Sequence, residues 1–281
     1  MTWALILHGG AGDYEADQLR DSVAFLEELR QELIEVLLKK GAREAVVLGL
    51  QRLEDHPQYN AGTGGNLQAD GVIRLTASLM SKDMGFASAS NLEQVQYPSL
   101  VANQLLGQKF PNLMGTQATL FAREQGHATH QNITEPRLKR YLARLSGVYS
   151  TVGVCALDED GVLFSGTSTG GVGWETPGRM SDVATPCGTY CSDKIALSAT
   201  GKGETILNSA ILPKLAGLLD YGIELHKAWD YSCLEFSRLG GDGGFIGVTQ
   251  AADMLSWHNT KGMRFTGANS FGKIVGHWRL L

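Results

Sequence analysis

Residues 150–171 read STVGVCALDEDGVLFSGTSTGG, and this stretch predicts two short strands joined by a turn at DEDG. The first strand begins on a threonine and the second ends in TSTGG. Strand packing does not require hydroxyl groups and glycines at these ends. Because threonine favours strands in general, β-propensity explains any one of these residues taken alone. A functional interpretation of the hairpin therefore depends on the rest of the chain.

The composition is that of an ordinary globular protein with one exception, glycine. Of 281 residues, 43% are apolar and 19% are charged, and the formal net charge is -5. A chain of this length can bury a large core without disulfides. The charge gives no reason to expect a nucleic acid or an anionic membrane as partner, so a small-molecule substrate is expected. The 35 glycines gather in runs such as HGGAG, NAGTGG and GGDGG, which predicts close backbone approaches.

The N-terminus and the cysteines indicate the compartment of the protein. MTWALILHGG contains an apolar run too short to span a bilayer, and it lacks the basic start and cleavage site of a signal peptide. We expect a buried strand in a cytoplasmic protein. The four cysteines are too few for a disulfide scaffold, and neither their spacing nor HATH at 127–130 matches a common metal site. No metal-ligating side chains are predicted.

Helical and strand patterns occur in blocks along the chain. Helical spacing of apolar residues runs from 17 to about 40, where Gly41 is placed to end the helix. Further helices are expected over 42–53, 97–108, 203–222 and 224–239, and strands over 71–80, 193–200 and, as a hairpin, 240–260. The polar segment 127–150 is typical of a connector with one short helix. Because strands follow strands and helices follow helices, an α+β fold with αββα layers fits better than alternating βαβ units.

The glycine-rich loops do not match nucleotide-binding motifs. In ATGKGET at 199–205, Gly203 stands where a P-loop needs Ser or Thr after the lysine. No GxGxxG follows a predicted strand. A nucleotide cofactor is therefore not predicted.

Thr151 lies where the polar connector meets the first strand of the hairpin. If the peptide bond before it were cut, this residue would carry a free α-amino group, whose ordinary pKa is about 7.7 to 8.0. Such an amine can act as general base for the hydroxyl of the same residue. Thr151 would then supply both the nucleophile and the base.

Six segments connect the chain to a known family. They occur in order along nearly the whole sequence: HGGAG at 8–12, YNAGTGG at 59–65, the block 150–182, TGKGE at 200–204, GGDGGFIGV at 240–248 and NTKGM at 259–263. With these segments the chain resembles the plant-type asparaginase and isoaspartyl peptidase family of N-terminal nucleophile hydrolases. The central block is the most specific of them, whereas HGGAG alone would be a weak signal.

The resemblance implies a precursor that cleaves itself between Ser150 and Thr151. Residues 1–150 would form an α fragment and residues 151–281 a β fragment of one four-layer αββα unit. The implied catalytic set is a nucleophile, a hydroxyl that hydrogen-bonds to it and two groups of the oxyanion hole: Thr151, Thr169, Thr200 and Gly201. One lost oxyanion donor typically costs about 10²- to 10³-fold in rate. Glycine is expected at 201 because a side chain would hold the substrate away from the N–H group.

The resemblance also implies a site for the amino-acid end of L-asparagine or an isoaspartyl dipeptide, either of which would be hydrolysed to L-aspartate. Arg179 would bind the α-carboxylate through two hydrogen bonds, and Asp182 would bind the α-ammonium. An isolated RxxD pair would instead be a surface ion pair. Gly203 would line the same pocket. Asn60 would lie near the nucleophile, although a turn before Ala61 also explains it.

The resemblance implies no required cofactor. A structural sodium held by backbone carbonyls of the loop Leu53–Thr63 is expected as an addition. The processed protein is expected to be a homodimer of two-fragment protomers.

The chain departs from the family pattern at three positions. Ser150 replaces the usual glycine or aspartate before the nucleophile, where glycine best tolerates the backbone strain that helps self-cleavage. Ser181 replaces the glycine before the aspartate, and Lys202 stands where a small or neutral residue is frequent. Two alternatives therefore stay open. One is an unprocessed, non-catalytic homologue that binds an amino acid or a partner, and the other is a relative acting on another aspartyl amide such as aspartylglucosamine.

Overall fold

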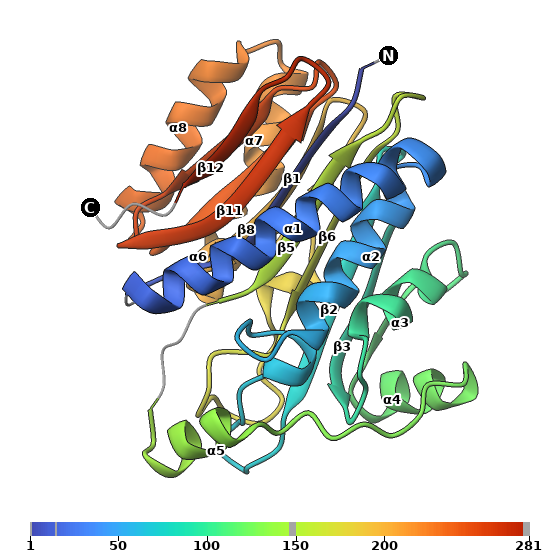
Figure 1. Ribbon diagram of the computed structural model, residues 1–281, viewed down its shortest axis with the longest axis vertical. Helices are drawn as coiled ribbons and strands as arrows, with labels where there is room; N and C mark the ends of the chain where they lie inside the picture. Colours follow the sequence, from blue (N-terminus) through green and yellow to red (C-terminus); the bar gives the residue numbers. More distant parts are fainter. Residues whose placement is uncertain (1, 15, 146–149, 278–281) are drawn as a thin grey trace.

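The computed structural model describes residues 2–14, 16–145 and 150–277, and within these ranges two β-sheets form its centre (Figure 1). The larger sheet has eight strands in the order β12 (Ile274–His277), β11 (Gly262–Asn269), β1 (Ala4–Gly12), β5 (Val152–Leu157), β6 (Leu163–Thr169), β2 (Arg74–Ser81), β3 (Phe86–Glu93) and β4 (Asn112–Met114). The smaller has four in the order β10 (Met254–His258), β9 (Gly243–Thr249), β8 (Ile195–Gly201) and β7 (Thr189–Cys191).

Eight α-helices accompany the sheets in the described part of the chain. They are α1 (Ala16–Lys40), α2 (Ala42–Asp55), α3 (Pro98–Leu105), α4 (Gly115–Glu124), α5 (Glu135–Leu142), α6 (Gly203–Ser209), α7 (Ile211–Asp220) and α8 (Leu225–Arg238). None of these described helices combines the length and the apolar character needed to cross a bilayer. The expected mixture of helix and sheet is confirmed.

The predicted hairpin of β5 and β6 lies in the middle of the larger sheet. Its strands are antiparallel, and Val152 pairs with Ser168. On its other edges β5 pairs with β1, where Gly153 faces His8, and β6 pairs with β2. This register brings the residue before β5 next to the last residue of β6.

Helices α1 and α2 lie side by side in front of the larger sheet (Figure 1). Gly41, with φ of +94°, separates them as the sequence predicts. Leu33 and Leu50 from these helices share one buried cluster with Val154 of β5. Gly166 on β6 permits this packing, because a β-carbon there would lie 2.7 Å from a methyl group of Leu50. The helices thereby support the hairpin from one side.

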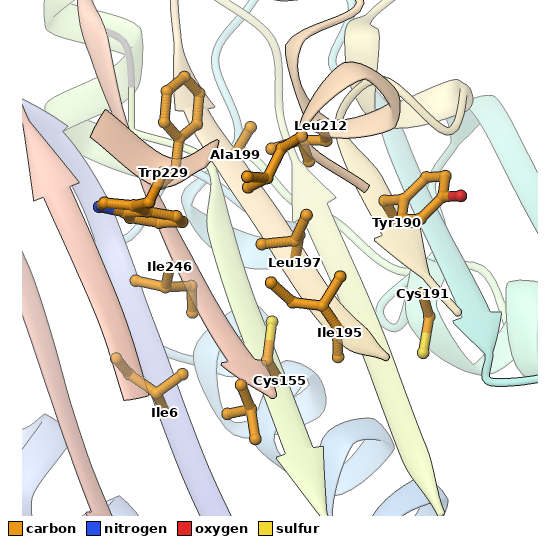
Figure 2. Close-up of a cluster of buried hydrophobic side chains, with 14 of the residues drawn as sticks. Ile6, Cys155, Tyr190, Cys191, Ile195, Leu197, Ala199, Leu212, Trp229 and Ile246 are labelled. Carbon is orange, nitrogen blue, oxygen red and sulfur yellow. The ribbon is translucent and has the colours of Figure 1, made fainter. Parts of the chain in front are cut away.

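A second buried cluster joins the two sheets to α7 and α8 (Figure 2). Ile6 and Cys155 of the larger sheet contribute to it together with Leu197 and Ile246 of the smaller sheet. From the helices come Leu212 and Trp229. Strand β8 packs against β5 and β6, and its Ser198 lies beside Gly153 near the start of the hairpin.

The structure differs from the sequence prediction in two respects. The single helix expected over 203–222 is two helices, α6 and α7, that meet at Ala210 with φ of +48°. Pro213 explains the break, because its ring nitrogen cannot donate to the carbonyl of Ser209. Strands β3, β4, β7, β11 and β12 and helix α4 were not predicted. The segment FASASNLE in β3 contains none of the β-branched residues Val, Ile and Thr that favour strands.

Candidate active site

Thr151 and Thr169 are in contact at the open end of the hairpin. The Thr151 side chain is 7% exposed, and its Oγ1 donates to Thr169 Oγ1 over 3.2 Å. Thr169 Oγ1 also accepts the N–H of Gly171 at 3.2 Å. The predicted neighbours are therefore within hydrogen-bond distance, and the backbone after β6 holds the second hydroxyl in place.

The HGGAG loop encloses the peptide bond before Thr151. Ser150 is 2% exposed, and its Oγ donates to the carbonyl of Gly9 at 3.1 Å. Gly10 has φ of +104°, and a β-carbon on it would lie 2.6 Å from Ser150 Cα. Glycine is needed at this position both for the backbone conformation and for the close approach.

Arg264 on β11 contacts the same peptide and was missed by the sequence analysis. Its Nη2 donates to Ser150 Oγ at 2.6 Å and to the Gly9 carbonyl at 2.5 Å. The guanidinium lies over the rings of Tyr14 and Tyr59, with distances of 4.2 and 4.8 Å to the ring centroids. The family-like segment NTKGM ends at Met263, directly before Arg264, and this adjacency was the available signal.

His8 is fully buried next to Thr151. Its Nδ1 accepts the N–H of Gly10 at 3.3 Å, and its Nε2 lies 2.9 Å from Ser198 Oγ. Burial lowers the pKa of His8 to about 3, although a hydrogen bond with the Thr151 backbone acts in the opposite direction. The imidazole is therefore neutral near pH 7. It orients neighbouring groups but does not titrate as a base near its ordinary pKa.

Thr200 and Gly201 end strand β8 and face β1 and β9. Thr200 is buried, and its Oγ1 accepts the N–H of Ala11 at 3.3 Å. Gly201 has φ of +136°, and a β-carbon there would overlap with the carbonyl of Asp242 and with Gly243. Sheet packing therefore requires glycine at 201, in addition to the expected approach of the substrate to its N–H group.

Arg179 and Asp182 lie together beside Gly203, as predicted. Arg179 Nη2 and Asp182 Oδ2 are both buried and have no hydrogen-bond partner. A β-carbon on Gly203 would lie 2.7 Å from Arg179 Nη2 and 2.5 Å from Asp182 Oδ1. Buried polar groups without partners are costly, so this arrangement favours a ligand that supplies both an acceptor and a donor.

The ion-pair partners of Arg179 are two glutamates that the sequence analysis missed. Its Nη1 lies 3.1 Å from Glu175 Oε2, and its Nε lies 2.7 Å from Glu204 Oε1. Burial raises the pKa of Asp182 to about 6, while the charge of Arg179 acts in the opposite direction. The two glutamates fix the arginine and leave Nη2 free for a ligand.

Asn60 is more than a turn residue. It is 1% exposed, and its Nδ2 donates to the carbonyl of Gly171 at 2.5 Å. Its backbone carbonyl accepts the N–H of Gly170 at 2.9 Å. Its Oδ1 is buried without a partner. Asn60 therefore holds the two residues after Thr169 by hydrogen bonds, and its Oδ1 remains available as an acceptor.

Within residues 2–14, 16–145 and 150–277, no group of three or more His, Cys, Asp or Glu side chains could hold a metal ion. The described cysteines are free, and burial raises the pKa of the Cys155 thiol well above its ordinary value.

Comparison with known proteins identifies the family. A family model described as asparaginase matches residues 1–147 and 142–274. The chain belongs to this family of amide-hydrolysing enzymes. The resemblance drawn from the six segments is thereby confirmed.

Individual relatives cover most of the chain. A protein of Nostoc sp. named isoaspartyl peptidase/L-asparaginase is 35% identical over 91% of this chain and 88% of its own length. A Synechocystis protein of the same name is 34% identical over 92% of this chain and 85% of its own length. A plant-type L-asparaginase of Pyrobaculum calidifontis is 31% identical, and the match covers 96% of both chains.

Proposed function

We propose that the chain cleaves itself between Ser150 and Thr151, and that the freed Thr151 hydrolyses L-asparagine and isoaspartyl dipeptides to L-aspartate. The observation that carries the proposal is the hydrogen bond between Thr151 and Thr169 at the start of a central strand. The names of the relatives support the substrate class. A non-catalytic homologue would not need a buried hydroxyl pair at this position.

Self-cleavage would begin with attack of Thr151 Oγ1 on the carbonyl carbon of Ser150. The C–N bond breaks, the Oγ1 proton passes to the departing nitrogen, and an ester forms that water hydrolyses. The buried hydrogen bonds of the Ser150 hydroxyl with Gly9 and Arg264 support the step because they restrict the movement of this residue beside Thr151. The products would be an α fragment, 1–150, and a β fragment, 151–281.

Amide hydrolysis would use the same oxygen. Thr151 Oγ1 attacks the side-chain carbonyl carbon of the substrate, and its proton passes to the freed α-amine of Thr151. We assign Thr200 Oγ1 and the N–H of Gly201 to the developing oxyanion. The amine then delivers the proton to the leaving nitrogen, and water hydrolyses the acyl-enzyme.

The buried, unpartnered atoms of Arg179 and Asp182 beside Gly203 would bind the amino-acid end of the substrate. Arg179 Nη2 would donate to the α-carboxylate, and Asp182 would accept from the α-ammonium. Ionised partners make such hydrogen bonds short and strong. Aspartylglucosamine shares the same amino-acid end, so these contacts alone do not separate it from asparagine.

The proposal extends to the assembly of the protein. We infer four layers in αββα order and a homodimer of processed protomers in the cytoplasm. A structural sodium in the loop Leu53–Thr63 is supported by the carbonyl oxygens of Pro57 and Tyr59, which converge beside Gly64.

The decisive experiment is an intact-mass time course of purified protein, followed by N-terminal sequencing of the smaller fragment. The sequence is expected to begin at Thr151, and Thr151→Ala is expected to remain one chain. The cleaved protein should then release aspartate from asparagine. A single uncleaved chain without activity would favour the non-catalytic alternative.

A further inference from the structure

A cavity of about 410 Å³ opens on the Ser150 side of the candidate active site. Arg137 and Arg140 of α5 and Arg264 of β11 all contribute to its lining, together with Tyr14 and Ser150. Three cationic side chains from two distant elements, α5 and β11, therefore line a cavity that also contains Ser150, the residue before Thr151.

The buried arginines of this cavity have no acidic partner in the described chain. Arg137 is 8% exposed and donates to the amide oxygen of Asn66 at 3.1 Å. Arg264 is 3% exposed and donates to neutral oxygens, and its Nε has no partner. The carboxylate of the lining, Asp13, is paired with Lys261 at 3.0 Å.

The electrostatics of the cavity therefore favour an anion. Burial lowers the pKa of Arg137 to about 10, and the charges of Arg140 and Arg264 act in the same direction. Buried charges are normally paired, so cations held close together without an acid would be stabilised by an anionic ligand.

The chemistry of the reaction determines which part of a substrate reaches this cavity. The freed α-amine of Thr151 would take the place of the nitrogen that is bonded to Ser150. Because this amine protonates the leaving group, the leaving nitrogen must come within about 3 Å of it, on the side where Ser150 now lies. From asparagine the leaving group is ammonia. From an isoaspartyl dipeptide it is an amino acid whose carboxylate is attached one carbon away from the leaving nitrogen.

We propose that the cavity is a carboxylate subsite, in which Arg264, Arg137 and Arg140 bind the free α-carboxylate of the amino acid released from an isoaspartyl dipeptide. The inference rests on the proposed function. The carboxylate takes the position of the Ser150 hydroxyl on Arg264, and guanidinium groups bind carboxylates through paired hydrogen bonds. The subsite therefore selects dipeptides with a free C-terminus.

The test compares isoaspartyl-leucine with its C-terminal amide as substrates of the processed protein. A charge-assisted hydrogen bond is worth about 1.5 to 3 kcal/mol, so kcat/KM is expected to be about 10- to 100-fold higher for the free acid. Arg140→Gln should bring this ratio closer to one. Lys139→Gln is the matched control, because Lys139 lies on the same helix, is 72% exposed and is paired with Glu135.

Each outcome decides the inference. Equal kcat/KM for acid and amide, with asparagine still hydrolysed, overturns the subsite and leaves the proposed function standing. Equal kcat/KM for acid and amide is also expected if the arginines bind the new C-terminal carboxylate of Ser150 after cleavage, and in that case the subsite is likewise not used by the substrate. A preference for the acid that Arg140→Gln leaves unchanged overturns the assignment to this cavity. Absence of hydrolysis of all three substrates overturns the proposed function and the subsite together.

Discussion

Arg179 and Asp182 meet at Gly203, where a β-carbon would lie 2.7 Å from Nη2 of the arginine and 2.5 Å from Oδ1 of the aspartate. Nη2 and the second carboxylate oxygen of Asp182 are buried without partners. The glycine therefore keeps open a space between a cation and an anion that each lack one hydrogen bond.

Filling this space with one methyl group should impair binding more than folding. Gly203 is the first residue of α6, where alanine is a good helix former, so the fold should tolerate Gly203→Ala. We expect kcat/KM for asparagine to fall on the order of 10²-fold, because the substrate is displaced from both charges. Gly217→Ala on α7 is the control, since nothing lies within 4 Å of its β-carbon position. Equal activity of both variants would contradict the pocket.

Removing the cation should act mainly on KM. Arg179→Ala leaves a desolvated substrate carboxylate unpaired, which typically costs about 2 to 5 kcal/mol. We expect a rise in KM of about 30-fold or more for asparagine. Arg238→Ala removes an arginine that is 70% exposed and paired with Glu235, and it should leave KM unchanged. If Arg179 were only a surface ion pair, the two variants would behave alike.

The hydroxyl of Thr169 should control self-cleavage. Thr169→Val removes the group that accepts from Thr151 Oγ1 and from the Gly171 N–H. We expect slower appearance of the two fragments on a denaturing gel. Thr169→Ser keeps the hydroxyl and should restore most of the rate. Cleavage of the valine variant at the wild-type rate would show that the hydroxyl bond has no part in the step.

The pH dependence of kcat/KM should include the ionisation of Asp182. Because its pKa is raised to about 6 by burial, the carboxylate that receives the substrate ammonium is lost as pH falls through about 6. kcat/KM for asparagine should fall over the same pH range. A separate fall is expected at higher pH, where the Thr151 amine, whose ordinary pKa is about 7.7 to 8.0, becomes protonated. An asparagine analogue without the α-amino group should lack the lower-pH fall. His8, with its pKa lowered to about 3, should contribute none.

Glu54 should make stability depend on pH. It is buried, and its carboxyl oxygens accept from Ser99 and from Ser168 Oγ. Burial raises the pKa of Glu54 from 4.5 to about 8, so the folded protein holds a proton that the unfolded chain releases. Through Glu54, the free energy of unfolding should therefore fall as pH rises from about 4.5 to 8. The lowered pKa of His8 acts in the opposite direction below its ordinary value of 6.5.

This dependence can be measured by urea unfolding at pH 5 and pH 8 in a Thr151→Ala background, which is expected to remain one chain. Adding Glu54→Gln should raise the stability at pH 8 relative to that at pH 5. If Glu54→Gln left the difference in unfolding free energy between pH 5 and pH 8 unchanged, other groups would be responsible for it.

Local signals in the sequence account for the correctly predicted elements. The hairpin, the helix ending at Gly41 and the hairpin of β9 and β10 each depend on periodicity and turn residues within a short stretch. Strand β3 was missed because its buried residues are mostly small or polar and take their stability from neighbouring strands. The break at Ala210 was missed although Pro213 offered a local signal.

The sequence by itself determined the hairpin that carries Thr151 and Thr169, because antiparallel pairing of two adjacent strands brings these residues together with little choice of register. Only the tertiary structure decided what surrounds them. Arg264 reaches Ser150 across 114 residues, and His8 reaches Ser198 across 190. Such contacts form because separate strands bury their apolar faces together, and no local pattern in the chain encodes which distant polar side chain that burial carries to the site.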